Sequence, residues 1–106
     1  MIFIESKVFE KLRETYFDDE SYKLFQNFLL EQPLVGDVIQ GTGGLRKVRW
    51  SANGKGKRGG VRIIYLYLVE KSHIHFLTVY AKNEISDLST NEKKILKNLV
   101  EELKNV

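Results

Sequence analysis

Basic side chains are concentrated in one stretch of the sequence, from Val38 to Val69. This stretch holds seven of the 17 Lys and Arg residues and none of the 14 Asp and Glu residues. The rest of the chain carries the other ten cations and all the carboxylates, so the net charge of +3 is a balance between a basic patch and an acidic scaffold. Because clustered cations repel one another unless an anion compensates them, the patch indicates contact with phosphate groups.

Two cations of this stretch share one face of a predicted strand over Leu45–Trp50. Side chains alternate along a strand, so Lys47 and Arg49 project from one face, and Arg46 projects from the other, apolar face. Neighbouring cations of this kind can hold a phosphate group. An ordinary solvated face of a sheet is the alternative interpretation.

A further cation, Arg62, opens the most apolar predicted strand. Burying a lone charge there is costly, so we expect Arg62 at the strand end, facing water, a partner or a phosphate. Tyr80, Lys82 and Asn83 follow the last predicted strand and can converge with Arg62, although a plain turn is also compatible with these residues.

A glycine-rich basic loop connects two of the predicted strands. The segment Gly54–Gly59 matches G-x-G-x-x-G, but it does not lead from a strand into a helix, which excludes the dinucleotide-binding interpretation. The loop also lacks the G-K-[ST] of a phosphate-binding loop. Its backbone amides and the cations Lys55, Lys57 and Arg58 can contact a nucleic-acid backbone, or they can keep an exposed loop soluble.

Other catalytic groups are scarce in the sequence. His73 and His75 share one face of a strand, but neither has a nearby Ser, Cys or carboxylate partner, and no third metal ligand is evident. The chain has no cysteine, which excludes thiolate nucleophiles and cysteine-bound zinc. Any chemistry therefore falls to Lys and Arg, and we expect neither a metal nor a cofactor.

The elements that position these residues indicate a single α+β domain spanning residues 1–106. An N-terminal strand precedes two amphipathic helices, which end before Pro33, and the capping box at Ser89–Glu92 starts a final helix. We expect the helices to flank one face of a small antiparallel sheet. Its predicted strands are Met1–Ile4, Val38–Ile39, Leu45–Trp50, Val61–Val69 and Ile74–Tyr80.

The longest apolar run, Ile63–Val69, has 7 residues, well short of the ~20 that cross a bilayer. Charged residues also interrupt the N-terminal segment, where a secretory signal requires an apolar run. A cytoplasmic location is therefore the expectation.

The pattern resembles the RelE/HigB toxins of bacterial type II toxin–antitoxin systems. The resemblance extends over nearly the whole chain and is carried by four segments: Gly36–Lys47, Gly54–Gly60, Arg62–Tyr65 and Tyr80–Leu88. It implies a RelE-like fold and a ribosome-dependent mRNA endoribonuclease, or mRNA interferase, that inhibits translation without a metal. Such an enzyme uses the 2′-hydroxyl of the RNA as nucleophile and leaves a 2′,3′-cyclic phosphate and a 5′-hydroxyl.

The same resemblance implies site residues. The catalytic set is Lys47, Arg49, Arg62 and Lys82, where the last position can also fall on Asn83. Charge and position add an RNA-binding set of Arg46, Lys55, Lys57, Arg58, Tyr80 and Asn83. Arg62, with Arg49 or Arg58, is expected to hold phosphate oxygens. Lys47 or Lys82 is expected to exchange protons as acid or base. RelE has a tyrosine where this chain has residues 86–89, so the resemblance leaves the general base unassigned.

The implied partners are a cognate HigA-like antitoxin, the ribosomal A site and mRNA. Two alternatives remain open at this point. One is a ParE-like toxin that poisons DNA gyrase on the same scaffold, and the other is a non-catalytic RNA-binding module that uses the same basic patch.

Overall fold

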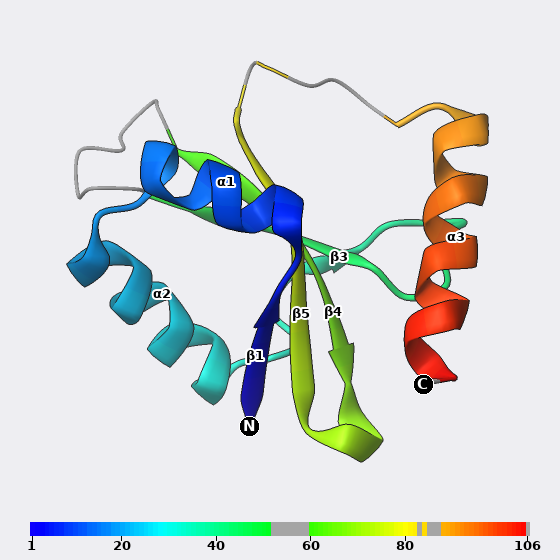
Figure 1. The fold of residues 1–106 in the computed structure, drawn as a ribbon, viewed down its shortest axis with the longest axis horizontal. Helices are drawn as coiled ribbons and strands as arrows, with labels where there is room; N and C mark the ends of the chain where they lie inside the picture. The colour runs from blue at the N-terminus through cyan, green and yellow to red at the C-terminus, as the bar shows by residue number, and fades with distance from the viewer. Residues whose placement is uncertain (52–59, 83, 85–87, 106) are drawn as a thin grey trace.

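Five strands form one sheet that lies between two layers of helices (Figure 1). The computed structural model describes residues 1–51, 60–82, 84 and 88–105. In chain order the elements are β1 (Ile2–Glu5), α1 (Lys7–Tyr16), α2 (Asp19–Glu31), β2 (Asp37–Val38), β3 (Arg46–Trp50), β4 (Val61–Leu68), a 3₁₀ turn (Val69–Lys71), β5 (His73–Ala81) and α3 (Thr90–Lys104). This arrangement confirms the predicted α+β class.

The three helices begin where the sequence places their caps. Ser6 accepts a hydrogen bond from the Phe9 backbone at the start of α1, and Asp18 does the same for α2. At α3, Ser89 and Glu92 form the complete capping box. Such caps satisfy backbone N–H groups that have no partner within the helix, and each contributes about 1 kcal/mol.

The sheet is mixed, which corrects the prediction of a wholly antiparallel one. The strand order is β1-β5-β4-β3-β2, and β1 pairs with β5 in parallel while every other pair is antiparallel. A contact from the turn after β1 accompanies this pairing, since the Ser6 hydroxyl donates to the Leu77 carbonyl at 2.7 Å. These two residues lie 71 positions apart, so no local pattern reveals the direction of β1.

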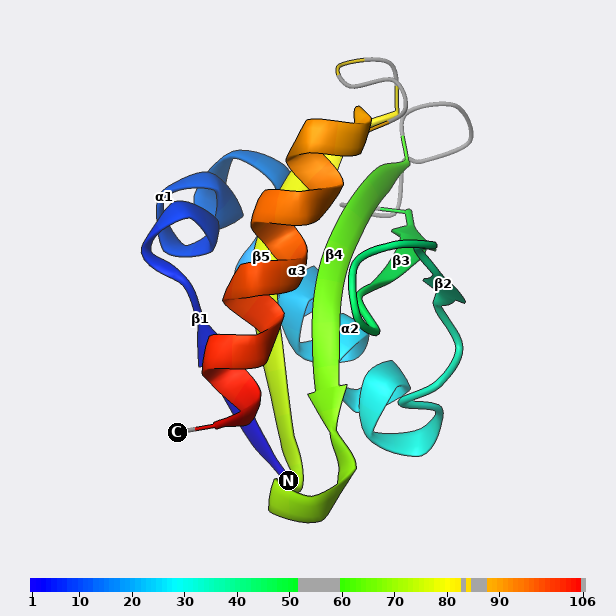
Figure 2. The same cartoon turned by 90° about the vertical axis from the view of Figure 1, so that its right-hand side faces the viewer.

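Helices cover both faces of the sheet, which corrects the expectation of a single covered face. Figure 2 shows α3 lying across the strands, with α1 and α2 beyond them. The strand β4 explains this arrangement, because its alternate positions are apolar on both sides. Ile63 and Tyr65 join the cluster beneath α1 and α2, whereas Ile64 and Leu66 join Val100 of α3 in a second cluster.

Part of the glycine-rich stretch serves the scaffold. Gly36 lies so close to Tyr65 that an added Cβ would be 2.8 Å from its ring. The Tyr65 hydroxyl donates to the Pro33 carbonyl at 2.8 Å and accepts from the Gly36 N–H at 3.0 Å, which fixes the connection from α2 to β2.

A second glycine segment supports α3. Thr42 is fully buried, and its hydroxyl bridges the Ile39 carbonyl and the Leu45 N–H within the turn before β3. Gly43 adopts a φ of +79° that other residues rarely tolerate, and its carbonyl accepts a hydrogen bond from the Lys104 ammonium at 2.9 Å. The turn therefore ties the end of α3 to the sheet.

None of the described helices combines the length and the apolar character needed to cross a membrane.

Candidate functional site

Strand register brings three predicted site cations onto one face of the sheet. Arg49 of β3 lies directly opposite Arg62 of β4, and Arg62 lies opposite Tyr80 of β5. Lys47 is two residues before Arg49 and therefore shares its face. This is the face that α3 covers, because Tyr80 belongs to the Val100 cluster. We call Lys47, Arg49 and Arg62 the basic row.

Among the residues that the structure describes, no ion pair involves the basic row. Cβ atoms of directly opposed residues lie about 5 Å apart, and like charges at such positions are destabilising. Lys47 and Arg49 are exposed, and Arg62 is half-buried. In the part of the chain that the structure describes, the ion pairs found both involve Arg13, which lies outside the row. An anion bound between Arg49 and Arg62 would relieve their repulsion.

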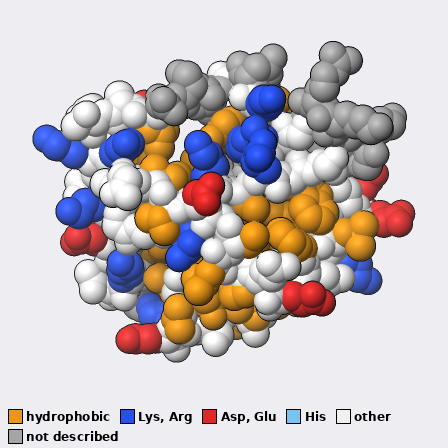
Figure 3. All heavy atoms as spheres, turned by 180° about the vertical axis from the view of Figure 1, so that it is seen from behind, with side chains coloured by type: hydrophobic (Ala, Val, Ile, Leu, Met, Phe, Trp, Pro, Cys, Tyr) orange, Lys and Arg blue, Asp and Glu red, His pale blue; other side chains and the backbone are white. Residues whose placement is uncertain are grey.

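In the space-filling view of Figure 3, Lys and Arg side chains gather in the upper middle of the surface, with an acidic side chain and hydrophobic groups beside them.

One carboxylate next to the basic row was not predicted from the sequence. Asp37 of β2 lies directly opposite Lys47 and is exposed. Ten residues separate the two, and only the register of the two-residue strand β2 brings them together.

The fourth predicted catalytic residue, Lys82, lies at the same end of the sheet. Its backbone N–H donates to the Gly60 carbonyl at 3.3 Å, which extends the β4–β5 ladder by one pair beyond Val61 and Ala81. Lys82 is exposed and follows Tyr80 by two positions, at the end of the sheet where Arg62 lies near the start of β4. The structure therefore places Lys82 near the basic row.

A pair of hydrogen bonds to Glu84, which no local pattern predicts, fixes the chain beside Lys82. We call it the Tyr16–Glu84 clasp. The Glu84 carboxylate accepts the Ala81 N–H at 2.6 Å and the Tyr16 hydroxyl of α1 at 2.5 Å. The hydrogen bond from Tyr16 is the main reason that the pKa of Glu84 lies below its ordinary value. The charged form of Glu84 thus holds the end of β5 against α1.

Arg46 does not join the basic row. It lies opposite Tyr65 on the other face, where its guanidinium donates to the Gly36 carbonyl at 2.7 Å and to the Leu34 carbonyl at 3.1 Å. Its charge is used to hold the α2–β2 connection. Trp50 is likewise a core residue, packed against Phe25 and donating from its indole nitrogen to Ser21 at 3.2 Å.

The remaining predicted RNA-binding residues, Lys55, Lys57, Arg58 and Asn83, lie outside the described residues, as does the basic loop. Tyr80 is buried beside Arg62, so it offers little ring surface for stacking on a base. His73 and His75 face one another near the far end of β5, away from the basic row.

Over the described ranges, no group of three His, Asp or Glu side chains is arranged to hold a metal ion. What the site offers is phosphate binding by guanidinium and ammonium groups, with Asp37 and Lys82 as polar neighbours.

The sequence also matches a known family. Residues 34–106 match the model of the RelE toxin of the RelE/RelB toxin–antitoxin system, a match that spans most of the chain and includes every strand of the basic row. The chain belongs to the RelE toxin family. Membership implies an antitoxin partner.

Solved structures of E. coli RelE share the fold. The crystal structure of the isolated toxin superposes with a TM-score of 0.57 at 15% identity, covering 92% of this chain and 97% of that one. A free-state structure of an arginine double mutant of the same toxin gives 0.53 at 16% identity, covering 78% of this chain and 83% of that one. At such identity the likeness extends to the fold, and the chemistry of this RelE-family chain has to be argued from its own residues.

Proposed function

We propose that this RelE-family chain is a ribosome-dependent mRNA endoribonuclease that inhibits translation. One observation carries the proposal: Arg49 and Arg62 lie opposite each other on neighbouring strands, and no described ion pair compensates them. Structural sheets avoid opposed like charges, whereas a site for a phosphodiester requires them.

The proposed reaction uses the 2′-hydroxyl of the RNA as its nucleophile. Its oxygen forms a bond to the adjacent phosphorus, the bond from phosphorus to the 5′-oxygen breaks, and the products are a 2′,3′-cyclic phosphate and a 5′-hydroxyl. The 2′-hydroxyl loses a proton and the leaving 5′-oxygen gains one. Arg49 and Arg62 neutralise the negative charge that builds on the phosphoryl oxygens.

Proton transfer is assigned to the two lysines that flank the arginines. Lys82 follows β5 and Lys47 lies on β3, and the proposal has them on either side of a phosphate held by Arg49 and Arg62. In this arrangement one lysine accepts a proton from the 2′-hydroxyl and the other donates to the leaving oxygen. Lys55, Lys57, Arg58 and Asn83, which lie outside the described residues, are further proposed RNA contacts.

The ribosome supplies what this small site lacks. A site of three or four cations does not by itself bend RNA into line for 2′-hydroxyl attack, and positioning is a large part of such catalysis. We therefore place the reaction in the ribosomal A site, with a HigA-like antitoxin as the neutralising partner.

Single substitutions at Arg62 of the basic row and at Lys82 test the proposal. We expect Arg62→Ala and Lys82→Ala to lower the cleavage rate of ribosome-bound mRNA by 100-fold or more, in line with the loss of a transition-state contact or of a proton-transfer group. Cleavage is read as new 5′ ends after brief induction. Lys23→Ala, an exposed lysine on α2, is the matched control and should cleave at the wild-type rate.

Three outcomes would contradict the proposal. Wild-type rates in both variants would reject this site. Intact messages in arrested cells that first show DNA damage would favour the gyrase-poisoning alternative. Ribosome binding without new RNA ends would favour a non-catalytic module.

A further inference from the structure

The last part of β5 is paired on one side of the strand only. Among the strands that the structure describes, β1 accompanies β5 as far as Phe76, and beyond this residue β5 pairs with β4 alone. Lys82 lies in the turn that follows β5, where its backbone N–H donates to the Gly60 carbonyl at 3.3 Å. A strand end with few backbone partners opens easily, so a side chain placed there needs another support.

The Tyr16–Glu84 clasp supplies that support. The Glu84 N–H donates to the Ala81 carbonyl at 3.0 Å, and the Ala81 N–H donates to the Glu84 carboxylate at 2.6 Å. From α1, the Tyr16 hydroxyl donates to the same carboxylate oxygen. Lys82 lies inside the turn that these three hydrogen bonds close, so they fix the point from which its side chain extends.

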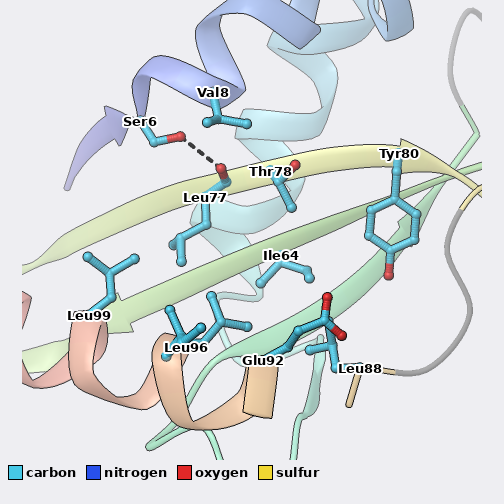
Figure 4. A pocket seen from close by; sticks show the side chains of 11 residues that line it. Ser6, Val8, Ile64, Leu77, Thr78, Tyr80, Leu88, Glu92, Leu96 and Leu99 are labelled. Atoms are coloured by element: carbon cyan, nitrogen blue, oxygen red, sulfur yellow. Dashed lines mark hydrogen bonds between the residues drawn. The ribbon is translucent and has the colours of Figure 1, made fainter. Parts of the chain in front are cut away.

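The clasp supports the end of β5 from the face opposite the basic row. Ala81 lies opposite Val61, which belongs to the core beneath α1 and α2, and the Tyr16 ring packs against the same core. Tyr80 points from β5 toward the side on which α3 lies (Figure 4), and Lys82 follows Tyr80 by two positions. Because side chains alternate along a strand, Lys82 is directed to the face of the basic row while Tyr16 stays on the other side of the sheet.

The hydrogen bonds of the clasp make Glu84 a poor proton acceptor for a reaction. Its carboxylate accepts from Tyr16 and from Ala81, and these two hydrogen bonds lower the pKa of Glu84. The hydrogen bond to Glu84 is also the main reason that the pKa of Tyr16 is raised, so the hydroxyl keeps its proton. Both groups are therefore suited to holding the chain and not to exchanging protons with a substrate.

We propose that Glu84 and Tyr16 are positioning residues that hold Lys82 beside the phosphate site. Their effect on cleavage rests on the proposed function, in which Lys82 exchanges a proton with the RNA. Lysine has a long and flexible side chain, so the space that its ammonium group reaches depends on where the backbone is held. A small displacement of Lys82 slows proton transfer without weakening phosphate binding, which the proposal assigns to Arg49 and Arg62.

Two substitutions remove the clasp in different ways. Tyr16→Phe deletes one hydroxyl and keeps the ring that packs against the core, whereas Glu84→Ala deletes the carboxylate. Tyr67→Phe is the matched control, since Tyr67 is a half-buried tyrosine near the opposite end of β4. Each purified toxin is titrated with ribosomes that carry mRNA, which gives kcat and KM for cleavage. Exchange of the Lys82 amide hydrogen with solvent is followed by NMR.

We expect both clasp variants to lower kcat by about 10-fold to 100-fold and to leave KM within about twofold of wild type, because the basic row is intact. The Lys82 amide hydrogen should exchange about 10-fold faster in both variants, and Tyr67→Phe should match wild type in every measurement. In a Lys82→Ala background, Glu84→Ala should cause no further loss of kcat, since the group that it positions is gone.

Unchanged exchange at Lys82 in both clasp variants would overturn the proposal whatever the cleavage data show. Faster exchange with wild-type kcat in an active toxin would also overturn it. An equal loss of kcat from Glu84→Ala in the wild-type and Lys82→Ala backgrounds would do the same, because a destabilised fold gives that result. Faster exchange in the variants of a toxin that does not cleave mRNA, wild type included, would support the clasp as the element that holds Lys82 and would reject the proposed function.

Discussion

At the scale of single residues, the site depends on side chains that do no chemistry themselves. Arg46 carries a charge next to Lys47 in sequence, yet it points to the opposite face and holds two backbone carbonyls. Because Gly36 has no Cβ, the Tyr65 ring can approach the backbone closely. These contacts fix the segment that leads into β2 and β3.

The close approach at Gly36 predicts that adding a single methyl group there destabilises the fold. Gly36→Ala forces a Cβ to within 2.8 Å of the Tyr65 ring and 3.1 Å of the Arg46 Cβ. Because both neighbours are held in place, we expect a loss of about 1–3 kcal/mol in the free energy of unfolding, measured in urea. A variant with unchanged stability would show that the segment moves freely.

At the scale of elements, β5 contributes side chains to the core on both faces of the sheet and pairs with two neighbouring strands. It pairs with β1 on one side and β4 on the other, and its register shifts between Phe76 and Thr78, where Leu77 is an extra residue. The bulge places Leu77 and Thr78 together along an apolar groove between β5 and α3. A local irregularity of the strand thus shapes this groove.

A histidine of the same strand predicts that the stability of the fold depends on pH. Burial is the main cause that lowers the pKa of His75, with His73 and Lys71 adding to it. The unfolded chain therefore binds a proton that the folded state resists, and stability should fall as pH decreases from about 6.5 toward the folded pKa. Urea unfolding between pH 7.5 and 5 should show this slope.

Replacing His75 by Asn should flatten the slope in that range. His73→Asn keeps the buried imidazole and should preserve most of it, because burial outweighs the charge of the neighbour. An equal slope in wild type and His75→Asn would assign the pH dependence to other groups.

Local sequence patterns predicted the helix starts and the faces of β3 correctly for physical reasons. Capping at Ser89 involves residues three apart, and the separation of Arg46 from Lys47 and Arg49 follows from the alternation of one strand. The direction of β1, the second helix layer and the contact of Asp37 with the row depend instead on the pairing of distant segments. The hydrophobic periodicity of a segment does not specify which distant segment it pairs with.

The candidate site, like the fold, could be predicted from the sequence only in part. The identity of the cations was evident from their concentration and from the absence of carboxylates nearby. Their convergence required the registers Arg49 to Arg62 and Arg62 to Tyr80. The Tyr16–Glu84 clasp joins residues 68 positions apart and could not be predicted from any local sequence pattern.

At the scale of the whole molecule, the charge is divided between a basic site and an acidic scaffold, and this division predicts a salt dependence. Three cations of the basic row on single-stranded RNA give a slope of about −2 in a plot of log affinity against log salt concentration. An oligonucleotide that carries 2′-deoxyribose at the cleavage position keeps the RNA intact during the measurement.

In the same titration, we expect Arg49→Ala to make the slope shallower by about 0.7, the contribution of one phosphate contact. Lys23→Ala, on the opposite side of the sheet, should leave the slope unchanged. Equal slopes in wild type and Arg49→Ala would show that the basic row does not contact the RNA backbone.

The parallel pairing of β1 with β5 also bears on how the protein is made. During synthesis β1 emerges first, but its pairing partner begins only at His73, so the edge strand waits until most of the chain has been translated. Such distant pairing slows folding, because a long loop must close before any contact compensates the lost entropy. A segment that is synthesised well before its partner is thus among the last to find its place.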